Sequence, residues 1–358
     1  MKFVHIADIH LDAPFTLLSD KLNIGEQRRI EQCMAFKKVI EYIKTNMIDY
    51  LFISGDLYES EYIKKSTLEY INSLFAEIPN TKIIISPGNH DPFIKDSPYD
   101  LFSFESNVYI FKSDDLEVIE EQEVNIYGSA FNDFYRENNP LENIKIMDNG
   151  KLNFLVLHCD LNGAKNQNDL AYLPISESKF KSLKFDYCAL GHIHKKYISN
   201  DNRIVYPGSL ISFGFDELGE HGMVVGEVVN NTIHIDFIKI DNREFVEENI
   251  DVELFNSQME IIDYINNYRF NKINFYKINL IGRRNFELNV KDISSGIIHE
   301  NILQIKDLTK MNYNIESIMN EKNLRGAFVN RVFALRDNQT ITQEEMDKML
   351  EIGLNAME

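Results

Sequence analysis

The chain has 358 residues, of which 44% are hydrophobic and 26% are charged, a composition that supports an ordinary hydrophobic core. Its longest apolar runs are strand-sized and polar residues interrupt the first ten positions, so we expect neither a membrane-spanning helix nor a signal peptide. The formal net charge of -19 argues against a broad basic surface for nucleic acid, and three cysteines without C-x-x-C spacing predict a reducing, cytoplasmic environment.

The first part of the chain alternates strand patterns with helix patterns. Apolar runs and segments of helical spacing follow in the order strand, helix, strand, helix, strand, over residues 3–7, 26–45, 50–54, 64–76 and 82–86. Each strand is followed by Asp, Gly or Pro-Gly, which are turn signals. This order predicts parallel strand pairing in a layered α/β domain.

The middle of the chain adds shorter strands and then changes its pattern. Strands are expected over residues 124–127, 152–157 and 187–190, and consecutive strands over residues 203–206, 222–229 and 232–240. Asn230-Asn231 between the last two strands predicts a hairpin turn.

The acidic stretch from Asp241 to Glu253 is the candidate domain border. Beyond it, helices over residues 254–268 and 292–300 alternate with strands over residues 273–281 and 302–305, which fits a small α/β unit. Final helices are expected over residues 324–335 and 342–357, and Thr342 with Glu345 predicts a capping box. We therefore predict a main domain over 1–240, a smaller domain over 241–335 and a C-terminal helical segment over 336–358.

Five short polar motifs follow predicted strands. They are Asp8-Ile9-His10, Gly55-Asp56, Gly88-Asn89-His90-Asp91, His158 and Gly191-His192-Ile193-His194. In an open α/β sheet the carboxyl ends of the strands are where sites form, so we expect the five loops to meet at one edge. Each motif alone has an ordinary explanation as a turn or a partly buried histidine, but their shared position predicts a metal site.

The side chains in these motifs suit a divalent metal centre. Carboxylate, amide oxygen and imidazole without thiolate fit Mn, Fe or Zn and disfavour a structural cysteine–zinc site. There are too many candidates for one ion, and two ions about 3.5–4 Å apart need a bridging carboxylate. Such a pair activates a shared water and stabilises an in-line displacement at phosphorus. Hydrolysis of a phosphate ester is therefore the predicted reaction class.

The order of the motifs resembles the calcineurin-like metallophosphoesterase superfamily over residues 1–240. The resemblance implies a sandwich of β-sheets flanked by helices, in which His90 contacts the scissile phosphate or protonates the leaving oxygen and Asp91 orients His90. It also implies seven metal ligands: Asp8, His10 and His194 for the first ion, Asn89, His158 and His192 for the second, and Asp56 as the bridge.

Longer segments are similar to SbcD-type exonucleases, and most of all to the bacterial YhaO group. They are Phe3 to Asp12, Gly55 to Tyr58, Asn89 to Pro92 with Ser97 to Tyr99, and three pieces within Tyr206 to Gly222, namely Tyr206 to Leu210, Phe213 to Glu217 and Gly219 to Gly222. The resemblance implies a dimeric, Mn-dependent DNA-repair nuclease with a capping domain, which works with an SMC-like, coiled-coil ABC-type ATPase. Some members carry a second histidine shortly after Gly-Asp, where this chain has Tyr58-Glu59, so exonuclease or endonuclease action and strand polarity stay open.

Residues close to the motifs have simpler interpretations. His5 is expected in the core, and His221, His234 and His299 lack metal-like spacing, with an approach of His221 to the site through its loop left as an alternative. Cys159 follows His158 directly, and neighbours on a strand point to opposite faces, so it should face away from the metals. Base stacking is an alternative to ordinary packing for the aromatic residues near the motifs, which are Tyr58, Phe93, Tyr99 and Phe213.

Three functions fit these observations. A DNA phosphodiesterase is favoured by the motifs, although the net charge of -19 counts against it. A small-molecule phosphodiesterase, acting on cyclic nucleotides or nucleotide-linked lipids, would use the same metal site. A non-enzymatic platform for a partner ATPase is disfavoured because the set of ligands is intact.

Overall fold

A computed structural model describes residues 1–15, 24–163 and 172–357 of the chain. The chain divides into two compact units, residues 1–244 and residues 245–358. Every motif residue lies in the first unit. Of the helices in the described ranges, none combines the length and apolar character that a membrane crossing requires.

One six-stranded sheet of the first unit has the order β14-β13-β1-β2-β3-β4. The neighbours from β1 to β4 pair in parallel, as the alternation of strands and helices predicted. The turn between β13 and β14 is the predicted hairpin, since Asn230 and Asn231 have the positive φ angles of 50° and 60° that such turns need. The strands are β1 (Lys2–Ile6), β2 (Tyr50–Ile53), β3 (Lys82–Ile85), β4 (Val108–Ile110), β13 (Gly222–Val229) and β14 (Thr232–Lys239).

A second six-stranded sheet packs against the first, in the order β11-β12-β10-β7-β6-β5. Aromatic side chains fill the space between the sheets: the Phe3 ring centroid lies 5.4 Å from that of Phe154 and 4.8 Å from that of Tyr187. The strands are β5 (Glu117–Glu120), β6 (Val124–Gly128), β7 (Leu152–His158), β10 (Tyr187–Gly191), β11 (Tyr197–Ile198) and β12 (Ile204–Tyr206).

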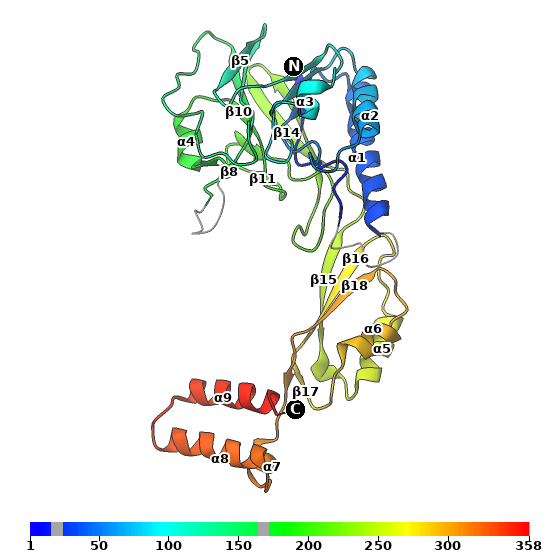
Figure 1. The fold of residues 1–358 in the computed structure, drawn as a ribbon, viewed down its shortest axis with the longest axis vertical. Helices are drawn as coiled ribbons and strands as arrows, with labels where there is room; N and C mark the ends of the chain where they lie inside the picture. The colour runs from blue at the N-terminus through cyan, green and yellow to red at the C-terminus, as the bar shows by residue number, and fades with distance from the viewer. Residues whose placement is uncertain (16–23, 164–171, 358) are drawn as a thin grey trace. The chain divides into compact units, whose positions relative to one another are not determined.

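Helices complete the layers of the first unit. The long helices α1 (Ile24–Asn46) and α2 (Lys65–Ala76) run alongside the first sheet (Figure 1). The predicted layered α/β fold, with sheets flanked by helices, is therefore confirmed. The smaller elements are α3 (Pro98–Leu101), β8 (Asp160–Leu161), β9 (Pro174–Ile175) and α4 (Glu177–Ser182).

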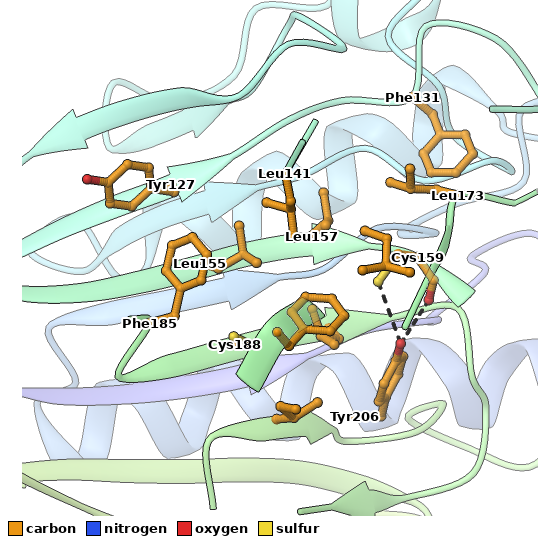
Figure 2. Close-up of a cluster of buried hydrophobic side chains, with 14 residues drawn as sticks. Tyr127, Phe131, Leu141, Leu155, Leu157, Cys159, Leu173, Phe185, Cys188 and Tyr206 are labelled. Atoms are coloured by element: carbon orange, nitrogen blue, oxygen red, sulfur yellow. Dashed lines mark hydrogen bonds between the residues drawn. The ribbon is translucent and has the colours of Figure 1, made fainter. Parts of the chain in front are cut away.

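A second hydrophobic cluster covers the other face of the second sheet (Figure 2). Cys159 is fully buried in this cluster, and its carbonyl oxygen accepts a hydrogen bond of 3.0 Å from the Tyr206 hydroxyl. Leu155 and Leu157 of β7 belong to the same cluster, whereas Phe154 and Val156 face the space between the sheets. The strand alternation therefore turns Cys159 away from the side on which His158 lies, as predicted.

The second unit contains a three-stranded parallel sheet in the order β15-β16-β18. β15 was not predicted, because its charged residues made it part of the acidic candidate border. The capping box of α9 is confirmed, since Thr342 and Glu345 exchange side-chain and backbone hydrogen bonds. The elements are β15 (Phe245–Asp251), the 3-10 turn Val252–Leu254, α5 (Gln258–Asn267), β16 (Phe275–Ile281), β17 (Arg283–Arg284), α6 (Val290–Gly296), β18 (Ile302–Asp307), β19 (Lys310–Met311), α7 (Ile315–Met319), α8 (Leu324–Asp337) and α9 (Gln343–Asn355).

A buried ion pair ties α1 to the segment that follows β14. The Arg28 side chain is fully buried and its Nη2 donates to Asp241 Oδ2 at 2.9 Å and to the Ser212 carbonyl oxygen at 2.6 Å. Asp241 Oδ2 also accepts the Ser212 backbone N–H at 3.0 Å. This link holds the loop after β12, which contributes to the candidate site.

Arg28→Ala should lower the free energy of unfolding by about 3–5 kcal/mol, because it leaves the buried Asp241 carboxylate without its cation. Urea unfolding followed by circular dichroism measures the loss. The neighbouring variant Arg29→Ala is the control and should cost less than about 1 kcal/mol, since its side chain is partly exposed. Equal losses in the two variants would show that the ion pair is not what stabilises this link.

Candidate metal centre

The five motifs meet at the carboxyl ends of strands from both sheets. Asp8, Asp56 and Asn89 follow β1, β2 and β3 of the first sheet, whereas His158 and His192 come at the ends of β7 and β10 of the second. We expected all five loops at one sheet edge. The structure instead divides them between two facing sheets whose strand ends converge.

Six of the expected site residues fall into tight groups of candidate ligand atoms. Asp56 connects two of these groups, since its Oδ2 lies 3.6 Å from His10 Nε2 and 3.3 Å from His158 Nε2. In each group one ligand atom per residue lies within 4.8 Å of the others; the groups are Asp8–His10–His194, His10–Asp56–His90 and Asp8–Asp56–His158.

Asn89 and His192 lie beside His158. The Asn89 side-chain oxygen is 3.0 Å from His158 Nε2, and the His192 ring centroid is 5.2 Å from that of His158. The backbone N–H of His192 also donates to Asp8 Oδ1 at 2.9 Å. The structure thus brings all seven residues expected to be ligands into one region.

The backbone is strained where these side chains are presented. Four of the residues adopt positive φ angles, which non-glycine residues rarely do: Asp8 (51°), His10 (51°), Asp56 (54°) and His192 (103°). Such conformations cost about 1–3 kcal/mol each and gather at functional sites. Their concentration here indicates that unfavourable backbone conformations are kept at these four positions because they orient the side chains toward the site.

Two glycines are required by close packing around the same side chains. A Cβ atom on Gly55 would lie 2.4 Å from His158 Nδ1, and one on Gly88 would lie 2.3 Å from Asp56 Oδ1. The Gly-Asp and Gly-Asn-His-Asp motifs therefore contain glycine because a side chain there would displace a candidate ligand.

The donor atoms fit a pair of divalent cations. Asp8 is fully buried, yet its Oδ2 has no hydrogen-bond partner among the described residues. His10 Nε2 and His194 Nε2 face each other at 3.1 Å, an arrangement that a shared cation would stabilise. Carboxylate oxygens and imidazole nitrogens that converge in this way suit the metals Mn, Fe and Zn.

Two glutamates that the sequence analysis did not select complete the site. Glu59 Oε1 lies 2.7 Å from His10 Nδ1, and Glu217 Oε1 lies 2.5 Å from His194 Nδ1. Carboxylates in this position orient a ligating imidazole so that its other nitrogen faces the metal. The sequence signals were their places: Glu59 lies three residues after Asp56, and Glu217 lies in the segment Tyr206 to Gly222 that is similar to SbcD-type exonucleases.

The expected role of Asp91 is corrected by its contacts. Its buried carboxylate accepts the backbone N–H groups of Gly88 at 2.7 Å, Asp56 at 2.9 Å and Leu57 at 2.7 Å, and the Tyr99 hydroxyl at 2.7 Å. Four donors satisfy this carboxylate, and the His90 ring contacts Glu59 instead, at 2.9 Å. Asp91 therefore fastens the loops after β2 and β3 to each other rather than orienting His90.

The nearby aromatic residues mostly pack inside the protein. Tyr58 and Tyr99 are buried, so neither is available for base stacking. Phe213 is partly exposed and stacks on Phe15, with ring centroids 5.1 Å apart and planes at 9°. His5 is a core histidine as expected, and its ring nitrogens contact the Tyr187 and Ser54 hydroxyls.

Charges within the site change several pKa values. Burial alone would lower the pKa of His158, but the adjacent Asp56 carboxylate raises it to about 9. Burial likewise disfavours the charged form of His194, whereas its hydrogen bond to Glu217 raises its pKa to about 9. Burial, followed by the charge of His158, lowers the pKa of His192 to about 3. Without metals, His158 and His194 therefore carry protons at neutral pH.

Metal binding should release these protons, because an imidazole binds a cation only through a deprotonated nitrogen. The apparent affinity for Mn should fall by about tenfold per pH unit for each displaced proton as the pH drops below 9. Calorimetric titration with MnCl₂ at pH 6 and pH 8, in buffers of different ionisation enthalpy, measures both affinity and proton release. A pH-independent affinity would contradict the assignment of His158 and His194 as ligands.

Comparison with known proteins identifies a family and a relative. The family model of the calcineurin-like phosphoesterases matches residues 1–196, a range that includes all the motif residues. The D subunit of the SbcCD nuclease from Staphylococcus epidermidis is a relative with 25% identity over 301 aligned residues, which cover 71% of this chain and 76% of that protein.

Proposed function

The chain belongs to the calcineurin-like phosphoesterase family, and from this premise we propose that it is a two-metal DNA phosphodiesterase. The family supports a hydrolytic, metal-dependent enzyme. The observation that carries the proposal is the position of Asp56 Oδ2, which lies within 3.6 Å of His10 Nε2 and 3.3 Å of His158 Nε2. A single carboxylate between two histidines of different motifs is what a bridged pair of ions needs.

Each side chain has a role in this proposal. When bound, two divalent ions lower the pKa of a shared water and stabilise the attacking and leaving oxygens at phosphorus. Asp8, His10 and His194 would hold one ion, and Asn89, His158 and His192 the other. His90, with a side chain that is 45% exposed, contacts the scissile phosphate or protonates the leaving oxygen.

The choice of DNA as substrate rests on the named relative, which is part of a nuclease. By the same argument we propose a role in DNA repair, an exonuclease activity, Mn as the native metal, and a coiled-coil ABC-type ATPase as partner. We likewise propose a homodimer and a capping role for the second unit. They follow from the resemblance to SbcD-type proteins and not from the geometry of the site.

A small-molecule phosphodiesterase is the second candidate. The formal net charge of -19 favours it, because a long polyanion such as DNA is repelled by an acidic protein unless basic patches or metals compensate. Cyclic nucleotides carry one phosphate and meet less of this repulsion. The same side chains would act on either substrate.

Hydrolysis assays separate the two candidates. The purified full chain in Mn would be given linear DNA, covalently closed circular DNA and cyclic AMP, with His90→Ala as the control for a contaminating nuclease. Loss of linear DNA alone, absent in the variant, supports the exonuclease. Turnover of cyclic AMP with both DNAs intact would overturn the DNA assignment and move it to the second candidate.

A further inference from the structure

Glu59 lies between a proposed metal ligand and the proposed catalytic histidine. Its Oε1 is 2.7 Å from His10 Nδ1 and its Oε2 is 2.9 Å from His90 Nδ1. We propose that Glu59 is a positioning residue that fixes the His90 ring relative to the metal centre by holding both imidazoles on one carboxylate. This inference rests on the proposed function, in which His10 binds metal and His90 serves the substrate.

The chemistry of the contact determines which ring nitrogen faces the reaction. A carboxylate only accepts hydrogen bonds, so both histidines donate from Nδ1 and act elsewhere through Nε2. For His10 this nitrogen faces the candidate metal position, 3.1 Å from His194 Nε2. The two rings meet edge to face, with centroids 4.8 Å apart and planes at 81°. One carboxylate thus orients both rings at once.

Main-chain groups also connect the loop after β2 to the loops after β1 and β3. The Glu59 backbone N–H donates to the Leu11 carbonyl oxygen at 3.0 Å. Ser60 donates to the His90 carbonyl oxygen through its backbone N–H at 3.0 Å and through its hydroxyl at 2.6 Å. The loop after β2 is therefore fastened to both motifs independently of the Glu59 side chain, so a substitution of that side chain should leave the loops in place.

Glu59 is a positioning residue and not a further ligand. Both of its oxygens are already engaged by imidazole nitrogens, and it belongs to none of the candidate metal groups among the described residues. Its side chain is 17% exposed, so the isosteric change to glutamine fits the same space. Glutamine presents one acceptor and one NH₂ group, which would face an imidazole N–H. One of the two rings must then turn, lose its contact or change its tautomer, and each of these outcomes alters which nitrogen faces the reaction.

The test uses Glu59→Gln in the full chain, with Glu69→Gln as matched control. Glu69 lies on the solvent side of α2 and pairs with Lys65. We expect kcat on linear DNA to fall about 10–100-fold with little change in KM, as for other groups that orient a reacting side chain. Mn stoichiometry and the melting temperature should stay close to those of the parent protein. If Glu59→Gln lost both ions, the variant would act through the proposed metal ligand His10, and the positioning role toward His90 would be overturned.

A double-mutant cycle shows whether Glu59 acts through His90. In a His90→Ala background, Glu59→Gln should cause a much smaller further loss of kcat, since only its contact with His10 remains. Bis(4-nitrophenyl) phosphate has a leaving group that needs no proton, so Glu59→Gln should slow it less than DNA if His90 is the acid. Full additivity of the two losses would overturn the inference.

A measurement without turnover keeps the inference separate from the proposed function. In metal-free protein labelled with ¹⁵N-histidine, Glu59→Gln should shift the Nδ1 signal of His10 or His90, and Glu69→Gln should shift neither. Unchanged signals would overturn the inference, whatever the substrate. If the parent protein cleaves cyclic AMP and spares DNA, the proposed function fails, and the same cycle measured on cyclic AMP still tests Glu59.

Discussion

Asp56→Ala is expected to bind neither metal ion and to lose turnover by about 10³-fold or more. The side chain lies in two of the three candidate groups, and its Oδ2 faces a histidine of each proposed ion. Metal centres contribute several kcal/mol to stabilising the charge that develops at phosphorus, and each 1.36 kcal/mol is a factor of about ten in rate. Removal of the shared ligand should therefore abolish both the metals and the reaction.

Metal analysis after gel filtration in MnCl₂, together with DNA hydrolysis, measures both effects. Two ions still bound to Asp56→Ala would disprove the bridging role. Asp56→Asn should lose metal and turnover to the same extent. It keeps an oxygen that can accept the backbone N–H of His90, which in the parent protein donates to Asp56 Oδ1 at 2.9 Å. This isosteric variant separates the loss of charge from the loss of the loop contact.

Asp96→Ala is the matched control for backbone strain. Asp96 is exposed and has a φ angle of 63°, close to the 54° of Asp56. Alanine in this left-handed conformation costs about 1–2 kcal/mol in either position. Asp96→Ala should therefore lose stability without losing metal or turnover. A comparable drop in metal content would indicate that strain, and not the missing carboxylate, empties the site.

His90→Ala is expected to keep both ions and to lose about 10²–10⁴-fold in turnover, the range typical of a positioned general acid. His90 lies at the edge of the site, with its ring centroid 4.8 Å from that of His10 and its Nδ1 engaged by Glu59. His90 is not among the ligands proposed for the two ions. Its loss should therefore remove a group that serves the substrate and leave the metal centre intact.

Steady-state hydrolysis of linear DNA and metal analysis of the same preparation measure this expectation. His234→Ala is the control, because His234 is an exposed histidine on β14 with no place in the candidate groups. Unchanged turnover in His90→Ala would remove His90 from the mechanism. Loss of one ion would reassign it as a ligand, since His90 also belongs to a candidate group with His10 and Asp56.

The sequence by itself determined the fold class, most of the strands and helices, and the region of the site. Period-two and helical patterns record which face of each element is buried, and they are local in the sequence. The hairpin at Asn230-Asn231 and the capping box at Thr342 were predictable for the same reason, because their hydrogen bonds join residues a few positions apart. The motifs were visible because turns after parallel strands gather polar residues.

Only the tertiary structure decided which partners those residues meet. Glu59 reaches His10 across 49 positions and Glu217 reaches His194 across 23, and no local pattern encodes such a contact. The role of Asp91 depended on three backbone N–H groups and a hydroxyl that converge only in the folded chain. β15 was missed because its charged residues do not show the apolar pattern typical of a strand. These residues form a strand because they pair with β16, a contact between segments that a local sequence pattern does not record. Contacts between distant segments follow from how the sheets pack, and packing is a property of the whole chain.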